Sequence, residues 1–425
     1  MLTIIDIILS VIFSALIVLH LSWISILVYP KKEEILLEKA APSISIVIPA
    51  HNEEETIGKA VKSVLDADYQ GKREVIVVND GSSDRTEEIV KKLATKDERI
   101  RIHNTDHVGK SKAINSGVEK AANEIIITLD ADSEIDKAGL TEMAKPFSDE
   151  EMGAVSGIVR AEYNLNPLTW FQDFEYIQSS AWRFICNKVN ATYIFPGFAA
   201  FRKDVFLKVG GFSNDTCSED FEIGLRLRKA GCKVGMSRAT MYTRVPETIR
   251  GLIKQRTRWG RGTVQVMRKH RDMILNWRYG VVGLYGIPTQ IYWYIHGFVY
   301  IPILAYQVSE GYYKYFLSNN VYFSLDVVKY FIGWFSVYGT IEYTYKTFQG
   351  YYEMTIVFVL LVIMFTLYLI YNILVLYKFA HPKKRHFFVI FFFFPYSLLS
   401  LTLHITPSIT EIFKPTGSNI WEKSK

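Results

Sequence analysis

Cysteines are scarce in this sequence, and two widespread nucleotide-binding motifs are absent. The 425 residues include only three cysteines, Cys186, Cys217 and Cys232, and no two of them form a C-x-x-C pair. This argues against a disulfide framework and a cysteine-ligated zinc site, so we expect free thiols. No G-x-G-x-x-G sequence follows the first expected strand, and no Walker A sequence occurs. Both absences disfavour a dinucleotide fold of the NAD kind and a P-loop nucleotidase.

Charged residues are nearly missing from two parts of the chain. Residues 3–29 and much of the chain after residue 281 are apolar, whereas residues 30–280 have the mixed composition of a soluble domain. The first apolar run is long enough to cross a bilayer, and it has neither the basic start nor the small-residue cleavage site of a signal peptide. We therefore predict an integral membrane protein in which a large polar domain lies between membrane segments.

The charges beside the apolar runs predict the orientation in the membrane. Lys31 and Lys32 directly follow the first run, so the positive-inside rule places the polar domain in the cytoplasm. The net charge of +6 fits either an anionic membrane surface or anionic ligands. Three or four spans are expected after residue 280, and residues 321–343 could span, lie in the interface or re-enter. The candidates are residues 281–306, 321–343, 355–377 and 386–405.

Strand and helix patterns alternate along the polar domain. Repeated βαβ units of this kind predict a mainly parallel sheet with right-handed crossovers and helices on both faces, which is the α/β class. The expected strands are residues 43–49, 74–78, 101–103 and 124–129, and the expected helices are residues 53–66, a segment ending near Ala94, and residues 110–122.

Acidic and polar residues collect where these strands end. Asp130 and Asp132 follow the fourth strand, and two carboxylates so close together imply a divalent cation. Polar loops follow the first strand, at Glu53, and the second, at Asp80, and the carboxyl ends of parallel strands share one edge. Singly, the acidic pair could be a solvated loop, Asp80 a turn residue and Glu53 a helix N-terminal charge. Their coincidence at one edge favours a ligand-binding crevice.

Five short motifs follow one another along the chain: residues 48–54, residues 78–84, Asp130-Ala131-Asp132, Ser218-Glu219-Asp220 and residues 255–259. In this order they resemble the motifs of the family 2 inverting glycosyltransferases. The last resembles Q-x-x-R-W, which is typical of processive, membrane-embedded members such as cellulose, chitin and hyaluronan synthases. The resemblance covers roughly residues 43–268 and implies a GT-A-like domain, with a mainly parallel sheet and helices on both faces, flanked by transmembrane helices.

The resemblance implies a UDP-sugar donor site. Asp80 would hydrogen-bond the uracil, Glu53 would help hold the nucleoside, and Lys110 would lie near the nucleotide. Asp130 and Asp132 would hold Mg²⁺ or Mn²⁺ against the diphosphate, where the metal neutralises charge on the leaving UDP. The implied substrate-binding residues are Pro49, Ala50, Glu53, Asp80, Lys110, Asp130, Glu219, Gln255, Arg258 and Trp259.

Asp220 is the expected general base, because inversion needs one carboxylate to take the proton of the attacking acceptor hydroxyl. A simpler interpretation makes Ser218 the N-cap of a helix with acidic residues in its first turn, and both can hold at once.

Gln255, Arg258 and Trp259 share one helix face. Arg258 could clamp a phosphate and Trp259 could stack on a sugar ring. The alternative is an interfacial amphipathic helix just before the membrane, and we expect both. Its basic surface would comprise Arg250, Lys254, Arg256, Arg261, Arg268 and Lys269.

The acceptor side is less informative. Residues 195–202 resemble the small-residue loop through which an acceptor sugar approaches in this family, but they depart from its commoner Gly/Ser-rich form. The amphipathic helix expected at residues 167–186 carries Asp173 and Glu175. Basic residues 383–385 favour an outside C-terminus, whereas residues 421–425 resemble a tail that lies inside in many relatives, so its side stays open.

These expectations divide the chain into an N-terminal transmembrane helix (1–30), a cytoplasmic catalytic domain (31–245), an interfacial helix (246–280) and a transmembrane region with its tail (281–425). The resemblance implies metal-dependent, inverting transfer from a UDP-sugar to a growing β-linked polysaccharide or oligosaccharide at the cytoplasmic face of the bilayer, with polymer export. No nucleic-acid partner is expected. Two alternatives stay open: transfer of one sugar to a polyprenyl phosphate, and a non-catalytic membrane scaffold.

Overall fold

The computed structural model describes residues 3–29 and 41–415. The chain divides into a helical unit, Met1–Pro30 with Thr289–Thr406, and an α/β unit, Lys31–Pro288 with Pro407–Lys425. Lys31, Lys32 and the tail at residues 421–425, on which the predicted orientation rests, lie outside the described residues.

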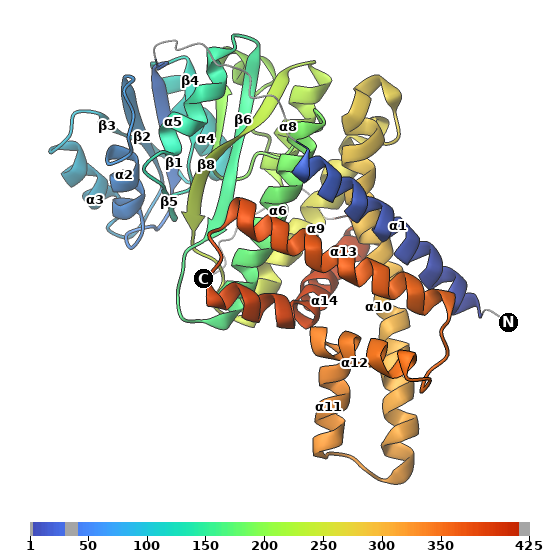
Figure 1. Cartoon of the computed structure of the whole chain (residues 1–425). Coiled ribbons are helices and arrows are strands. Elements are labelled where there is room, and N and C mark those ends of the chain that lie inside the picture. The colour runs from blue at the N-terminus through green and yellow to red at the C-terminus, as the bar shows by residue number, and fades with distance from the viewer. Residues whose placement is uncertain (1–2, 30–40, 416–425) are drawn as a thin grey trace. The chain divides into compact units, whose positions relative to one another are not determined.

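An eight-stranded sheet forms the centre of the α/β unit (Figure 1). Its strand order is β3-β2-β1-β4-β7-β6-β8-β5, and β1 pairs in parallel with both β2 and β4. The four predicted strands are all present, which confirms the α/β class. The strands are β1 (Ile44–Ala50), β2 (Arg73–Asp80), β3 (Ile100–Thr105), β4 (Ile125–Thr128), β5 (Ser133–Ile135), β6 (Met152–Ala161), β7 (Ala199–Arg202) and β8 (Lys233–Thr243).

Each face of the sheet packs against a buried core. Successive side chains along a strand point to opposite faces, so neighbouring residues of one strand belong to different cores. In β1, Ile46 and Ile48 belong to one core with helices α2 (Ile57–Leu65) and α5 (Gly139–Ala144). Val47 belongs to the other core with α4 (Lys110–Lys120), α7 (Lys203–Lys208) and α8 (Glu219–Lys229). Burial on both faces explains why these strands read as continuous apolar runs rather than as alternating ones.

Two local differences from the sequence prediction have clear causes. The helix expected from residue 53 begins at Ile57, because Glu53 is held before it: its amide donates to Thr86 Oγ1 over 2.7 Å and its carboxylate accepts from Thr56 Oγ1 over 2.7 Å. The loop expected at residues 195–202 ends in β7, which inserts antiparallel between β4 and β6 because Ala199–Arg202 completes their ladders.

The α/β unit contains further α-helical segments. These include α3 (Thr86–Ala94), α6 (Pro167–Lys188), α9 (Ile249–Lys269) and the last turns of α14, which belong to this unit from Pro407 onward.

Within the helical unit, α1 (Ile4–Val28) and α13 (Ile356–Phe379) are long and apolar enough to cross a membrane. They pack together, and Lys378 Nζ donates to Leu27 O over 3.0 Å. Helix α14 (Lys384–Phe413) bends by 66° and counts as a third candidate if its two parts form one span. Helix α10 (Ile287–Tyr315) is not among the candidates, so its crossing stays a prediction.

Residues 321–343, for which three alternatives were open, do not form one continuous helix. Helix α11 (Leu325–Trp334) ends before Ser336, whose hydroxyl caps helix α12 (Val337–Phe348). The two helices have 10 and 12 residues, each too short to cross a bilayer alone.

Helix α8 touches the backbone before β7 so closely that only glycine fits at position 224. A Cβ there would lie 1.8 Å from Tyr193 O. We expect Gly224→Ala to destabilise the protein by about 2 kcal/mol, because this backbone contact cannot be relieved by a side-chain rotation. Thermal unfolding of the detergent-purified chain measures the effect.

Gly58→Ala is the matched control, since Gly58 also lies in a helix but its Cβ would meet nothing nearer than 3.9 Å. This change should be neutral or slightly stabilising, because alanine favours helix. Equal melting temperatures for the two variants would contradict the packing described here.

Candidate functional site

The loops after β1 and β2 lie side by side at the carboxyl edge of the sheet. Pro49 and Ala50 are the last paired residues of β1, opposite Val78 and Asn79 of β2. Glu53 follows them and is buried. The structure therefore brings the first two predicted loops together, as parallel strand pairing requires.

Asp80 has a role that the sequence did not indicate. Its Oδ1 accepts hydrogen bonds from Val108 N and Thr105 Oγ1, both over 2.7 Å, and its Oδ2 accepts from Gly109 N over 2.9 Å. The buried carboxylate thus fixes the loop that leads into α4. Its predicted hydrogen bond to a uracil remains a prediction. Beside it, the rings of His51 and His107 lie 4.1 Å apart.

Lys110, the first residue of α4, joins two of the predicted acidic motifs. Its Nζ lies 2.7 Å from Asp130 Oδ1 and 3.5 Å from Glu219 Oε1. Burial disfavours the charged ammonium, but the two carboxylates outweigh it and raise the pKa of Lys110. A permanent positive charge therefore lies between the loop after β4 and the start of α8.

The acidic pair is crowded. Burial, followed by repulsion from Asp130, raises the pKa of Asp132 to about 6. Thr243 Oγ1 donates to Asp132 Oδ1 over 3.4 Å. On the other side, a Cβ at Gly197 would lie 2.6 Å from Asp130 Oδ2, so the segment before β7 runs directly against the pair. No local sequence pattern indicates this contact of Gly197.

Asp220 lies half-buried in the first turn of α8. Its Oδ1 accepts from Phe221 N over 2.9 Å, and its carbonyl accepts from Phe195 N over 3.3 Å. Burial and Glu219 raise the pKa of Asp220 to about 6, against the charges of Lys110 and Arg258. Ser218 occupies the N-cap position, but its hydroxyl makes no capping hydrogen bond.

Helix α9 carries the Gln255–Trp259 motif. The positive charge of Arg258 acts on both Lys110 and Asp220, where it opposes the rise in the pKa of each. Farther along the helix, Gln265 Oε1 accepts from Cys217 N over 2.8 Å and so holds the loop before Asp220. Local sequence offered no signal for the contact between Gln265 and Cys217.

The basic surface predicted for α9 is only partly present. The prediction was wrong for Arg256, which is buried. Arg256 is 0% exposed and pairs with Glu175 of α6, whose carboxylate offsets part of the cost of burying the guanidinium. Arg261 pairs with Glu411 of α14 over 3.3 Å, and Lys269 pairs with Asp215 over 2.8 Å.

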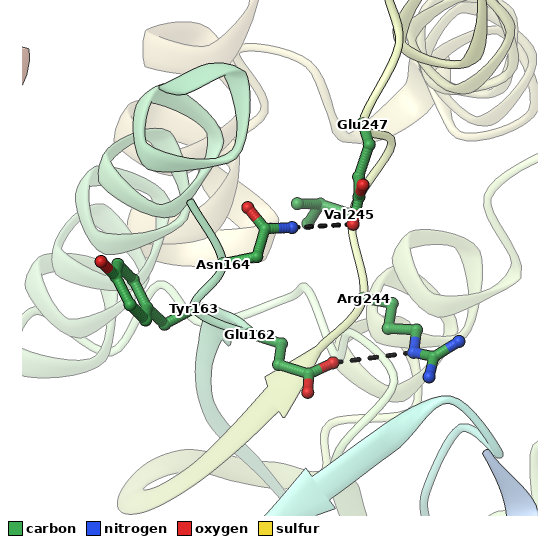
Figure 2. A pocket seen from close by; sticks show the side chains of 6 residues that line it. All are labelled: Glu162, Tyr163, Asn164, Arg244, Val245 and Glu247. Atoms are coloured by element: carbon green, nitrogen blue, oxygen red, sulfur yellow. Dashed lines mark hydrogen bonds and ion pairs between the residues drawn. The ribbon is translucent and has the colours of Figure 1, made fainter. Parts of the chain in front are cut away.

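A cavity of about 340 Å³ lies where β6 and β8 end (Figure 2). Two polar pairs line it: Asn164 with Glu247, over 2.7 Å, and Arg244 with Glu162, over 3.6 Å. Arg244, which lines this cavity, also donates from its backbone amide to Asp132 O over 3.4 Å. Among the described residues, no group of three or more His, Cys, Asp or Glu side chains is arranged to hold a metal.

Comparison with known proteins assigns the domain. The sequence profile described as Glycosyl transferase family 2 matches residues 45–210. The chain contains a glycosyltransferase family 2 domain. The match includes the positions from Pro49 to Asp132 that sequence analysis singled out, whereas Glu219, Asp220 and the α9 motif lie beyond it.

Curated relatives of this family 2 domain include polysaccharide synthases. Poly-beta-1,6-N-acetyl-D-glucosamine synthase of Staphylococcus aureus is 31% identical over 245 residues, which cover 56% of this chain and 58% of the synthase. Probable glycosyltransferase YdaM of Bacillus subtilis is 34% identical over 247 residues, covering 54% and 57%. The match thus spans less than two thirds of the length of these relatives.

The family 2 domain also has a solved structural neighbour. The mannosyltransferase PcManGT of Pyrobaculum calidifontis, in complex with GDP-Man and Mn²⁺, superposes with a TM-score of 0.58 at 20% identity, covering 87% of this chain and 98% of that one. This likeness confirms the GT-A-like fold.

Lys110 should stabilise the folded protein, because its positive charge offsets the repulsion between the carboxylates of Asp130 and Glu219. We expect Lys110→Met to lower the free energy of unfolding by about 2 kcal/mol at neutral pH, which is below the loss for a fully buried pair because 17% of the side chain is exposed. The loss should shrink in acid, where the carboxylates become protonated. Thermal unfolding at both pH values tests this, with Lys112→Met, an exposed neighbour on α4, as the control. A Lys110→Met protein as stable as the control would refute the pairing.

Proposed function

We propose that the chain is a membrane-embedded, inverting glycosyltransferase that moves a sugar from a UDP-sugar to a growing β-linked polysaccharide. The observation that carries this proposal is the position of Lys110 between Asp130 and Glu219, with Asp132 and Asp220 beside them in sequence. Two separate motifs of the family, Asp130-Ala131-Asp132 and Ser218-Glu219-Asp220, thereby meet at one lysine. The 31% identity to a polysaccharide synthase supports a polymeric product.

The membrane assignment rests on α1 and α13, which frame the domain in sequence. Lys31 and Lys32 support a cytoplasmic catalytic site by the positive-inside rule. In this proposal the polymer is made on the cytoplasmic side and leaves through helices of the same chain.

Asp130 and Asp132 would hold a divalent cation, Mg²⁺ or Mn²⁺. Their chemistry fits this group, because burial and mutual repulsion raise the pKa of Asp132 to about 6 and a hard cation relieves that repulsion. The structural neighbour contains Mn²⁺. When bound, the metal supplies Lewis-acid stabilisation of the departing diphosphate. Lys110 and Arg258 contribute further positive charge to the same group of side chains.

Asp220 acts as the general base in this proposal. The acceptor hydroxyl attacks the anomeric carbon from the face opposite UDP, its proton passes to the Asp220 carboxylate, and the bond from the anomeric carbon to the UDP oxygen breaks. A pKa of about 6 suits this task, since the carboxylate is ionised at neutral pH yet is a stronger base than an ordinary aspartate.

The second candidate is transfer of one sugar to a polyprenyl phosphate. The structural neighbour is described as a mannosyltransferase in complex with GDP-Man, a description that names a sugar transfer but no polymer. In the third, a non-catalytic scaffold, Asp220 would have no proton to accept, and the acidic pair at Asp130 and Asp132 would have no diphosphate to face. The size of the product distinguishes polymer synthesis from transfer of a single sugar. Any detectable sugar transfer excludes the non-catalytic scaffold.

Membranes containing the protein should convert one UDP-sugar of a labelled panel, with UDP-N-acetylglucosamine tested first, into long chains that a linkage-specific glycosidase degrades. EDTA should stop the reaction, and Mg²⁺ or Mn²⁺ should restore it. Membranes without the protein are the control. A single-sugar lipid product would favour the second candidate, and activity unchanged by EDTA would remove the role of the acidic pair.

Asp220→Asn should lower the transfer rate by at least about 100-fold, the contribution of a general base, while UDP binding stays within about twofold. In the unsubstituted protein, the rate should fall below pH 6 as the raised pKa of Asp220 lets it take up a proton. The control is Asp215→Asn, which changes an acidic residue that lies in the preceding loop and pairs with Lys269. Full activity in Asp220→Asn would contradict the assignment of Asp220 as the general base.

A further inference from the structure

Arg256 is the largest of the fully buried side chains in the described part of the chain. It belongs to the Gln255–Trp259 segment but occupies one of the positions that Q-x-x-R-W leaves variable. A charged side chain without contact to water needs a structural reason, because desolvating an ion costs several kcal/mol.

The surroundings of Arg256 supply that reason. Its Nη2 donates to Glu175 Oε2 on α6, and its Nη1 donates to Gln255 Oε1. Its guanidinium carbon lies 4.3 Å from the centre of the Trp259 ring. One buried cation thus contacts the first and last residues of the motif and anchors both to a second helix.

The geometry of this contact defines the orientation of the indole. A planar guanidinium can lie flat on an aromatic ring while it donates in its own plane to carboxylate and amide oxygens. Glu175 holds the guanidinium, and the guanidinium lies over one face of Trp259. The next residue, Tyr176, closes the arrangement: its ring lies 6.1 Å from that of Trp259, and its hydroxyl bonds with Gln255.

We propose that the Arg256–Glu175 pair positions Trp259 and Gln255 for the sugar at the acceptor end of the reaction. Arg256 is a positioning residue, since it acts through the side chains that would meet the acceptor. The inference rests on the proposed function and deepens it by assigning Gln255 and Trp259 of α9, held from α6, to the acceptor, whereas Arg258 of the same helix contributes charge on the donor side. The donor-side contacts of Lys110 come from α4, the loop after β4 and α8. The pair should therefore govern chain elongation more than donor binding.

Two substitutions test this in the full-length protein, with UDP-N-acetylglucosamine, or the UDP-sugar that the panel selects in its place, as the probe. Arg256→Lys keeps the charge but loses the planar contact, and Glu175→Gln removes the compensating carboxylate. We expect both to shorten the product chains severalfold and to lower kcat about tenfold, while the KM for the donor stays within twofold. Combining Glu175→Gln with Arg256→Met should recover thermal stability relative to Glu175→Gln alone, because no unpaired cation then remains buried.

Arg160→Lys is the matched control. Arg160 is also buried and makes a bidentate pair, over 2.8 Å for each bond, with Asp173, which lies two residues before Glu175 on α6. This change should lower the melting temperature yet leave product length unaltered.

Three outcomes would overturn the inference. Wild-type product length in Arg256→Lys would remove the positioning role, and equal shortening in Arg160→Lys would reduce the effect to the packing of α6. A wild-type protein that transfers no sugar would refute the proposed function and the inference together.

Discussion

Repulsion among carboxylates is the constraint on which this site depends. Asp130, Asp132, Glu219 and Asp220 come from two distant parts of the chain, and bringing them together is unfavourable unless positive charge lies among them. Lys110 supplies that charge, bonded to Asp130 over 2.7 Å. Its own position depends on Asp80, whose carboxylate accepts two hydrogen bonds from the loop before α4, at Val108 and Gly109, and a third from Thr105 at the end of β3. Asp80 therefore helps to set the position of the Lys110 ammonium group beside Asp130.

Close backbone approach is the second requirement. The segment from Tyr193 to Gly197 runs between the acidic pair and α8, touching Asp130 at Gly197 and α8 at Gly224. Phe195 N also donates to the carbonyl of Asp220. One stretch of backbone thus separates the proposed base from the proposed metal ligands at a set spacing. A side chain larger than hydrogen at either glycine would widen that spacing.

The helix that carries the last motif is held by charge on more than one side. Arg256 pairs with α6, while Arg261 pairs with Glu411 in the last turns of α14. What reads in sequence as a basic surface for lipid headgroups is therefore in part a set of ion pairs within the α/β unit. The guanidinium of Arg256, held by this pairing, lies over the ring of Trp259 in the same motif.

The sequence by itself determined the α/β class, the positions of the first four strands along the chain, the loops that meet at the carboxyl edge of the sheet and the two most apolar helices. These features depend on periodicity and composition over short windows, which the chain carries locally. Tertiary structure alone decided that residues 321–343 form two helices, that Asp80 fixes a loop, that β7 enters the sheet and that Arg256 is buried. Arg256 and Glu175 are 81 positions apart, and Asp220 is farther still from Lys110. Such pairs are chosen by the packing of whole helices on the sheet, so no local pattern could have indicated them.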